Sequence, residues 1–104
     1  MARIGNIITA AALTAGLAPA ATAAPEHLAA IERECGRQLG MAAEGCRCMR
    51  DRAAKLNDGQ QAFVAAVVLK DKQAQAMTRQ KLSVQELTEA GTFLTTASSQ
   101  CSQR

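Results

Sequence analysis

Four cysteines constrain the fold of this chain more than any other feature of its sequence. Cys35, Cys46, Cys48 and Cys101 form an even set in a chain of 104 residues. A bridge from the C-x-C pair to Cys101 closes a loop of more than about fifty residues, and by chain entropy such a bridge is worth about 4 kcal/mol. That amount is comparable with the net stability of a small domain. We therefore expect two structural disulfides.

The spacing of Cys46 and Cys48 limits how the four cysteines can pair. Side chains two residues apart on a helix point in nearly opposite directions, so a bridge between them would require the helix to unwind. Four cysteines allow three connectivities, and two of these avoid a Cys46–Cys48 bridge. We expect Cys101 to pair with either Cys46 or Cys48, and Cys35 to pair with the other.

The start of the chain, residues 1–23, has the features of a secretory signal peptide. Arg3 gives it a positive start, residues 4–17 carry no charge, and the A-T-A sequence ending at Ala23 fits a cleavage site. Cleavage there leaves residues 24–104 as a single helical domain of about 80 residues, which buries only a marginal core. We expect the bacterial periplasm or secretion, where disulfides persist, and no stable membrane insertion after cleavage.

The mature chain predicts an all-α fold, a small disulfide-stabilised bundle of about four helices. No run alternates apolar and polar residues as a half-buried strand would. Good helix formers such as Ala, Gln, Leu, Lys and Arg dominate instead. We expect helices over residues 26–39, 44–56, 59–79 and 84–101.

Capping signals and apolar stripes support these four helices. Asp58 with Gln61, and Ser83 with Glu86, fit the capping-box pattern before the third and fourth helices. Residues at spacings of three and four give the expected buried faces, which are Leu28, Ile31, Cys35 and Leu39; Cys46, Met49, Ala53 and Leu56; Phe63, Val67, Ala74 and Met77; and Val84, Leu87, Gly91, Leu94, Ser98 and Cys101. Val64 and Ala66 flank the third of these faces, and Ala90, Phe93 and Ala97 widen the fourth. Because Gly91 and Ser98 are small, we expect a neighbouring helix to approach closely there.

Composition and motifs argue against several classes of function. The formal charge is only +3 and the aromatic residues are only Phe63 and Phe93, whereas nucleic-acid binding needs a basic surface and stacking aromatics. With one histidine, His27, and no G-x-S-x-G motif, no hydrolytic site is supported. No C-x-x-C motif supports redox catalysis, and no C-x-x-C-H motif supports haem attachment. We expect a non-enzymatic protein without catalytic residues, without a cofactor and without a nucleic-acid partner.

A cluster of basic residues surrounds and follows the C-x-C pair. It comprises Arg47, Arg50, Arg52 and Lys55, and Asp51 interrupts it. The plain interpretation is the solvated face of a helix, and the functional one is a docking patch for an acidic partner or an anionic lipid surface. We predict a non-catalytic protein-binding module, an adaptor, inhibitor or chaperone-like protein, whose partner the sequence does not identify.

The alternative function, from a different class, is soft-metal binding. Cys46-x-Cys48 and the adjacent Met49, with Met41, Met77 and His27, offer thiolate and thioether ligands suited to Cu(I), as in a periplasmic copper-binding or carrier protein. Against this, Met49 and Met77 lie on expected core stripes, where methionine usually fills space, and the paired spacings of zinc sites are missing. We therefore assign no metal site from the sequence and keep copper binding as the alternative.

Overall fold

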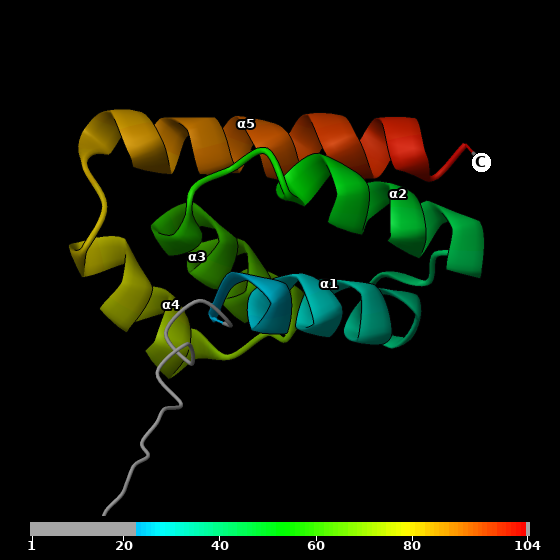
Figure 1. Ribbon diagram of the computed structural model, residues 1–104, viewed down its shortest axis with the longest axis horizontal. Coiled ribbons are helices and arrows are strands. Elements are labelled where there is room, and N and C mark those ends of the chain that lie inside the picture. The colour runs from blue at the N-terminus through cyan, green and yellow to red at the C-terminus, as the bar shows by residue number, and fades with distance from the viewer. Residues whose placement is uncertain (1–22, 104) are drawn as a thin grey trace, which may run out of the picture.

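The computed structural model describes residues 23–103, and within this range it contains five α-helices and no strand (Figure 1). The helices are α1 (Ala23–Leu39), α2 (Ala43–Ala53), α3 (Asp58–Val68), α4 (Lys72–Gln80) and α5 (Val84–Cys101). None of these five is both long and apolar enough to cross a membrane. The expected all-α fold is confirmed, with one helix more than expected. The signal peptide expected over residues 1–23 lies outside the described residues, apart from Ala23.

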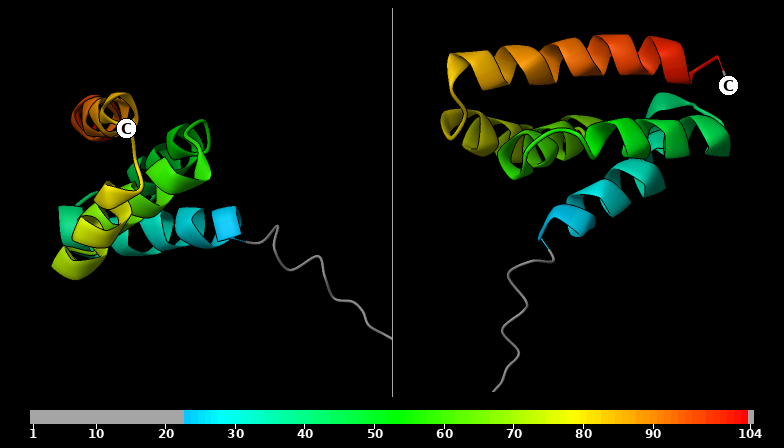
Figure 2. Two further views of the ribbon diagram at one scale, coloured as in Figure 1. Left: turned by 90° about the vertical axis from the view of Figure 1, so that its left-hand side faces the viewer. Right: turned by 45° about the horizontal axis from the view of Figure 1, so that its top comes forward.

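Two helices form a middle layer between the other elements. α2 and α3 lie between α1 on one side and α5 on the other, as the end-on view of Figure 2 shows. α4 follows α3 at the end of the molecule away from α2, and its main contacts are with α3 (Figure 1). The centre of the core is formed by Ile31, Met49, Val64 and Val68, which are fully buried or nearly so.

Two disulfides join three of the helices. Cys35–Cys46 connects α1 to α2 across a sequence separation of 11, and Cys48–Cys101 connects α2 to the end of α5 across a separation of 53. All four cysteines are therefore paired, in one of the two connectivities that we expected. Cys46 faces α1 and Cys48 faces α5, so α2 is anchored on both sides.

The single helix expected over residues 59–79 is wrong, because the chain leaves the helix at Lys70. Lys70 has a φ of 60°, in the left-handed region, and the Asp71 amide donates to the Ala66 carbonyl at 3.0 Å. This pattern is a Schellman ending. The Asp71 side chain then accepts from the Ala74 amide and begins α4. The sequence hid this break because the left-handed position holds lysine and not the usual glycine.

The capping box of α3 lies one residue earlier than expected. Asn57, not Asp58, is the N-cap; its side chain accepts from the Gln60 amide at 2.8 Å, and the Gln60 side chain accepts from the Asn57 amide at 3.0 Å. The capping box expected at the start of α5, between Ser83 and Glu86, is confirmed. Both boxes satisfy amides that a helix start leaves without partners.

The two capping boxes also bond to each other and align the starts of α3 and α5. The Asn57 side-chain amide donates to Glu86 Oε2 at 2.9 Å, and the Gln60 side-chain amide donates to the Glu86 carbonyl at 3.0 Å and to Glu89 Oε1 at 2.9 Å. Bonds from the Ser83 amide and from the Asn57 side chain hold the pKa of Glu86 below its usual value. The N-terminal end of α5 is thus fixed by hydrogen bonds, and its C-terminal end by a disulfide.

The buried face of α5 is centred on Ala90 and Ala97, which the sequence placed at the flank of the expected stripe. Ala90, Ala97 and Cys101 are buried, whereas Gly91 is exposed and has no atom within 4 Å of where a Cβ would lie. The close contact predicted at Gly91 is therefore wrong. A close contact does occur at Gly45 of α2, where a Cβ would lie 2.9 Å from the Cys101 carbonyl oxygen.

The buried faces expected for the first two helices are confirmed at their centres. Four residues of these faces are inaccessible to solvent, namely Ile31, Cys35, Met49 and Ala53, and Cys46 is nearly inaccessible. Two ends of the expected stripes depart from this pattern. Leu39, the last residue of α1, is 40% exposed. Met77, the last residue of the stripe expected for the third helix, lies on α4 instead and is 54% exposed.

Candidate functional site

The C-x-C pair does not present two thiols to one ligand. Cys46 bonds to α1 and Cys48 bonds to α5, so the two sulfur atoms are directed to different sides of α2. Met77 is exposed on α4, and His27 lies half-buried near the start of α1. Within residues 23–103, no group of three or more His, Cys, Asp or Glu side chains is placed to hold a metal ion. The ligand set considered for Cu(I) is therefore not brought together around the C-x-C pair.

One member of the predicted docking patch, Arg50, contacts a neighbouring helix. Arg50 Nη1 lies 2.8 Å from Glu32 Oε1 on α1, and the hydrogen bond to Glu32 raises the pKa of Arg50 further above its usual value. This ion pair joins the exposed edges of α1 and α2. The charge of Arg50 is thus already matched within the protein, whereas Arg47 and Lys55 are exposed.

Two other patch residues border an open recess beside the Cys48–Cys101 disulfide. The recess has a volume of about 380 Å³ and is lined by Glu44, Arg47, Cys48, Asp51 and Arg52. The recess has as many carboxylates as arginines, so their fields largely cancel at a distance. The structure thus brings Arg47 and Arg52 together at a recess without net charge, and leaves Lys55 outside it.

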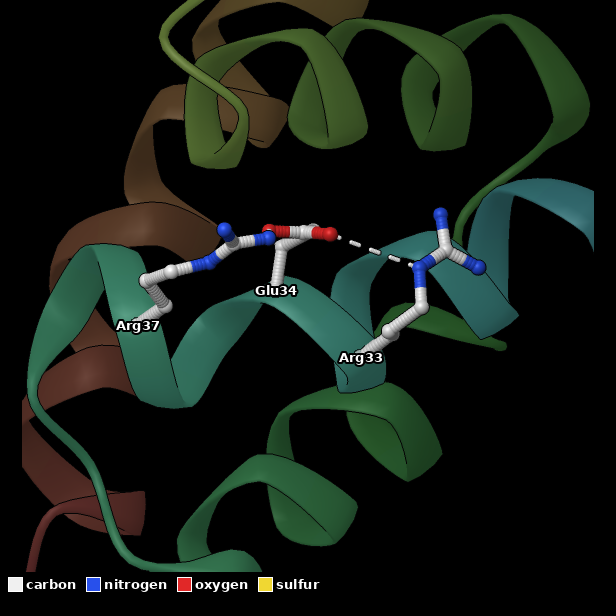
Figure 3. A network of polar contacts seen from close by, with 3 residues as sticks. All are labelled: Arg33, Glu34 and Arg37. Carbon is white, nitrogen blue, oxygen red and sulfur yellow. Dashed lines mark hydrogen bonds and ion pairs between the residues drawn. The ribbon is translucent and has the colours of Figure 1, made fainter.

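A buried carboxylate on α1 lies between two arginines (Figure 3). Glu34 Oε1 accepts from Arg37 at 2.7 Å, and Glu34 Oε2 lies 3.4 Å from Arg33 Nε. Glu34 is only 9% exposed. The hydrogen bond from Arg37, together with the charges of both arginines, holds the pKa of Glu34 below its usual range. A carboxylate that is ionised at neutral pH does not act as a general acid.

The most unusual surface surrounds α4, and we call residues 69–84 the α4 surface. α4 has no buried residue and packs mainly against α3. Three of the four large apolar side chains that are exposed in the described part of the chain belong to this segment: Leu69 at 37%, Met77 at 54% and Val84 at 83%. A chain of this size normally buries such side chains where it can. Their exposure on one segment indicates that α4 and its flanking residues pack against little of the rest of the protein.

The α4 surface also carries the positive charge of the protein. It contains the exposed bases Lys70, Lys72, Arg79 and Lys81 and a single acid, Asp71. Its net charge is therefore +3, equal to the formal charge of the entire chain, so acids and bases elsewhere balance. No side-chain ion pair involves these four bases within the described residues.

Sequence reasoning missed the α4 surface because it assigned this segment to one long, buried helix. The signal was present in the polar run Lys70-Asp71-Lys72, which interrupts the apolar pattern after Leu69. An aspartate three residues before Ala74 also fits an N-cap position. What the pattern alone did not show is that Met77 faces solvent.

Comparison with known proteins gives this chain no relative: no family model, no curated protein and no solved structure matches it.

Proposed function

We propose that this protein is an exported, non-catalytic protein-binding module, and that the α4 surface is where it contacts its partner. The observation that carries the proposal is the combination on one segment of exposed apolar side chains with a net charge of +3. An adaptor, an inhibitor or a chaperone-like protein would each act through such a contact.

The chemistry of the α4 surface defines the partner that fits it. An exposed methionine adapts its shape to apolar pockets, and apolar anchors supply most of the binding energy of protein interfaces. Unpaired lysines and arginines around an anchor steer an acidic surface towards it and speed association. The partner is therefore a protein with an acidic rim around an apolar pocket that accepts Met77.

The position of the disulfides supports the same assignment. They join α1, α2 and α5, whereas α4 carries no covalent constraint and no buried side chain. A helix with few buried contacts belongs to the part of a fold that adjusts most readily. The disulfides thus constrain the helices α1, α2 and α5, whereas α4, where we place the contact, can adjust to a partner.

The place of action follows from the cysteines. Two intramolecular disulfides indicate an oxidising environment outside the cytoplasm. We place the protein in the bacterial periplasm or among secreted proteins, after removal of residues 1–23. The mature protein then begins at Ala24, at the start of α1. Intact mass measurement of the exported protein tests this, and a full-length mass would contradict export by signal cleavage.

Site-specific photo-crosslinking in the natural host tests the contact surface. A photoreactive residue replaces Met77 in one variant and Thr96, which is exposed on α5, in a matched control. We expect one adduct of defined mass at position 77 and none at position 96. Reversing Lys72 and Lys81 to glutamate should abolish the adduct without lowering the melting temperature.

Two results would refute the proposal. One is the absence of an adduct at position 77, or equal adducts at positions 77 and 96. The other is charge-dependent co-sedimentation of the protein with phosphatidylglycerol vesicles without any protein adduct, which would assign the α4 surface to an anionic membrane.

A further inference from the structure

Three sulfur atoms meet where α1 ends and α2 begins. Cys35 of α1 is bonded to Cys46 of α2, and Met41, in the loop between the two helices, places its Sδ 3.9 Å from Cys35 Sγ. The cluster is distinct from the C-x-C pair, because it uses Cys46 but neither Cys48 nor Met49. It combines two potential thiolates with one thioether, the ligands that soft metal ions prefer.

The separation of the sulfur atoms matches a three-coordinate site. Metal–sulfur bonds to thiolates are about 2.3 Å long. Three sulfur atoms at that distance around one ion in a plane stand roughly 4 Å apart, by the geometry of an equilateral triangle. The distance of 3.9 Å between Cys35 Sγ and Met41 Sδ already matches this separation. Cys35 and Cys46 would reach it once the bond between them is broken and their sulfur atoms separate.

An open cleft borders this cluster at Met41 and Cys46. The cleft has a volume of about 310 Å³ and is lined by Glu32, Arg33, Gly36, Met41, Ala43 and Cys46. A Cβ at position 36 would lie 4.0 Å from Cys46 Sγ, so the glycine keeps the space beside that sulfur free of a side chain.

The two helices have further contacts that hold the cluster together without the disulfide. Only a short loop, residues 40–42, separates α1 from α2, and Gly40 in the left-handed conformation turns the chain there. The Arg50–Glu32 ion pair, at 2.8 Å, joins the same two helices. Reduction of Cys35–Cys46 therefore leaves the three sulfur atoms near one another.

We propose that Cys35, Cys46 and Met41 form a Cu(I) site when the Cys35–Cys46 disulfide is reduced. A dithiol reductant supplies two electrons and two protons, so that the Sγ–Sγ bond becomes two thiols while the dithiol becomes a disulfide. Cu(I) then displaces both thiol protons and binds two thiolates and the Met41 thioether, with no change in its oxidation state. This site does not depend on the function proposed for the α4 surface.

Competition for Cu(I) tests the site on the mature protein. The chain is reduced with a phosphine without oxygen, and one equivalent of Cu(I) is partitioned between the protein and bicinchoninate. Alkylation then reports which thiols the metal protects. We expect protection of Cys35 and Cys46 and full modification of Cys48 and Cys101.

Two methionine variants separate ligation from packing. Met41→Leu keeps the volume of the side chain but removes the sulfur, and it should weaken Cu(I) binding by at least about tenfold, the lower range for supporting groups of metal sites. Met49→Leu, in the core, should leave the affinity unchanged. Equal affinities of the wild type and Met41→Leu would overturn the proposal. So would protection of Cys48 and Cys101, or equal modification of all four cysteines because the reduced chain unfolds.

Discussion

Loss of the Cys48–Cys101 disulfide should destabilise this protein more than loss of Cys35–Cys46. The sequence separations are 53 and 11. The entropy of loop closure in the unfolded chain then predicts a loss of about 4 kcal/mol for the first bridge and about 3 kcal/mol for the second. We propose to replace each pair by alanines, because a single replacement would leave a free thiol able to form dimers.

The melting temperature and hydrogen exchange report the two losses. For a domain of this size, each kcal/mol lowers the melting temperature by about 4–8 °C, so Cys48→Ala/Cys101→Ala should melt at least about 15 °C lower than the wild type. Exchange protection should fall first at the C-terminal end of α5. The start of α5 remains bonded to α3 through Glu86 and Asn57. The variant without Cys35 and Cys46 should lose protection between α1 and α2 instead.

The order of the two losses is the decisive point. If both double variants melt within about 5 °C of the wild type, the premise that the disulfides supply much of the stability is wrong. If the Cys35–Cys46 variant is the less stable of the two, closure of the long loop is not what stabilises α5. A uniform loss of protection over all helices would contradict the local role assigned to each bridge.

Three further predictions concern single side chains. Gly91→Ala should raise the free energy of unfolding by about 1 kcal/mol, because the position is helical and open. Gly45→Ala should lower the free energy of unfolding, because a Cβ there meets the Cys101 carbonyl oxygen. Chemical denaturation measures both changes. Met49→Ala should cost about 2–5 kcal/mol from the core, whereas Met77→Ala should change stability by less than about 0.5 kcal/mol. Because hydrogen bonds lower the pKa of Glu86 in the folded state, its contribution to stability is full above the ordinary Glu pKa of about 4.3 and is lost as the pH falls through the lowered value. Glu86→Gln should flatten acid denaturation in that range, and an unchanged acid transition would contradict this.

The sequence predicted the elements whose signals are local. The last of the four expected helices, α5, was predicted correctly because Ser83 and Glu86 form a reciprocal cap. The end of α1 was predicted correctly because it lies beside Gly40, which has the left-handed φ of 70° that glycine favours. The opposed directions of Cys46 and Cys48 followed from helix geometry alone. The choice between the two remaining connectivities did not, because it depends on which side of α2 each neighbouring helix packs.

The sequence misled where tertiary packing decides the outcome. Lys70 adopts a conformation that lysine rarely has, so the end of α3 left no residue signal. On α5 the apolar pattern was broad enough to fit two faces, and the fold buries Ala90 and Ala97 while Gly91 faces outward. The α4 surface was missed because the sequence did not show that the helix ends at Lys70. Met77 was therefore expected on the buried face of a single helix over residues 59–79.

Tryptic mapping of the non-reduced protein tests the central claim most directly, namely that two disulfides anchor α2 on opposite sides. Trypsin cleaves after arginine and lysine, and Arg47 lies between Cys46 and Cys48, so each cysteine falls on its own peptide. We predict two linked pairs, Cys35 with Cys46 and Cys48 with Cys101. A Cys46–Cys101 link, a Cys46–Cys48 link or four free thiols would contradict this arrangement of the helices.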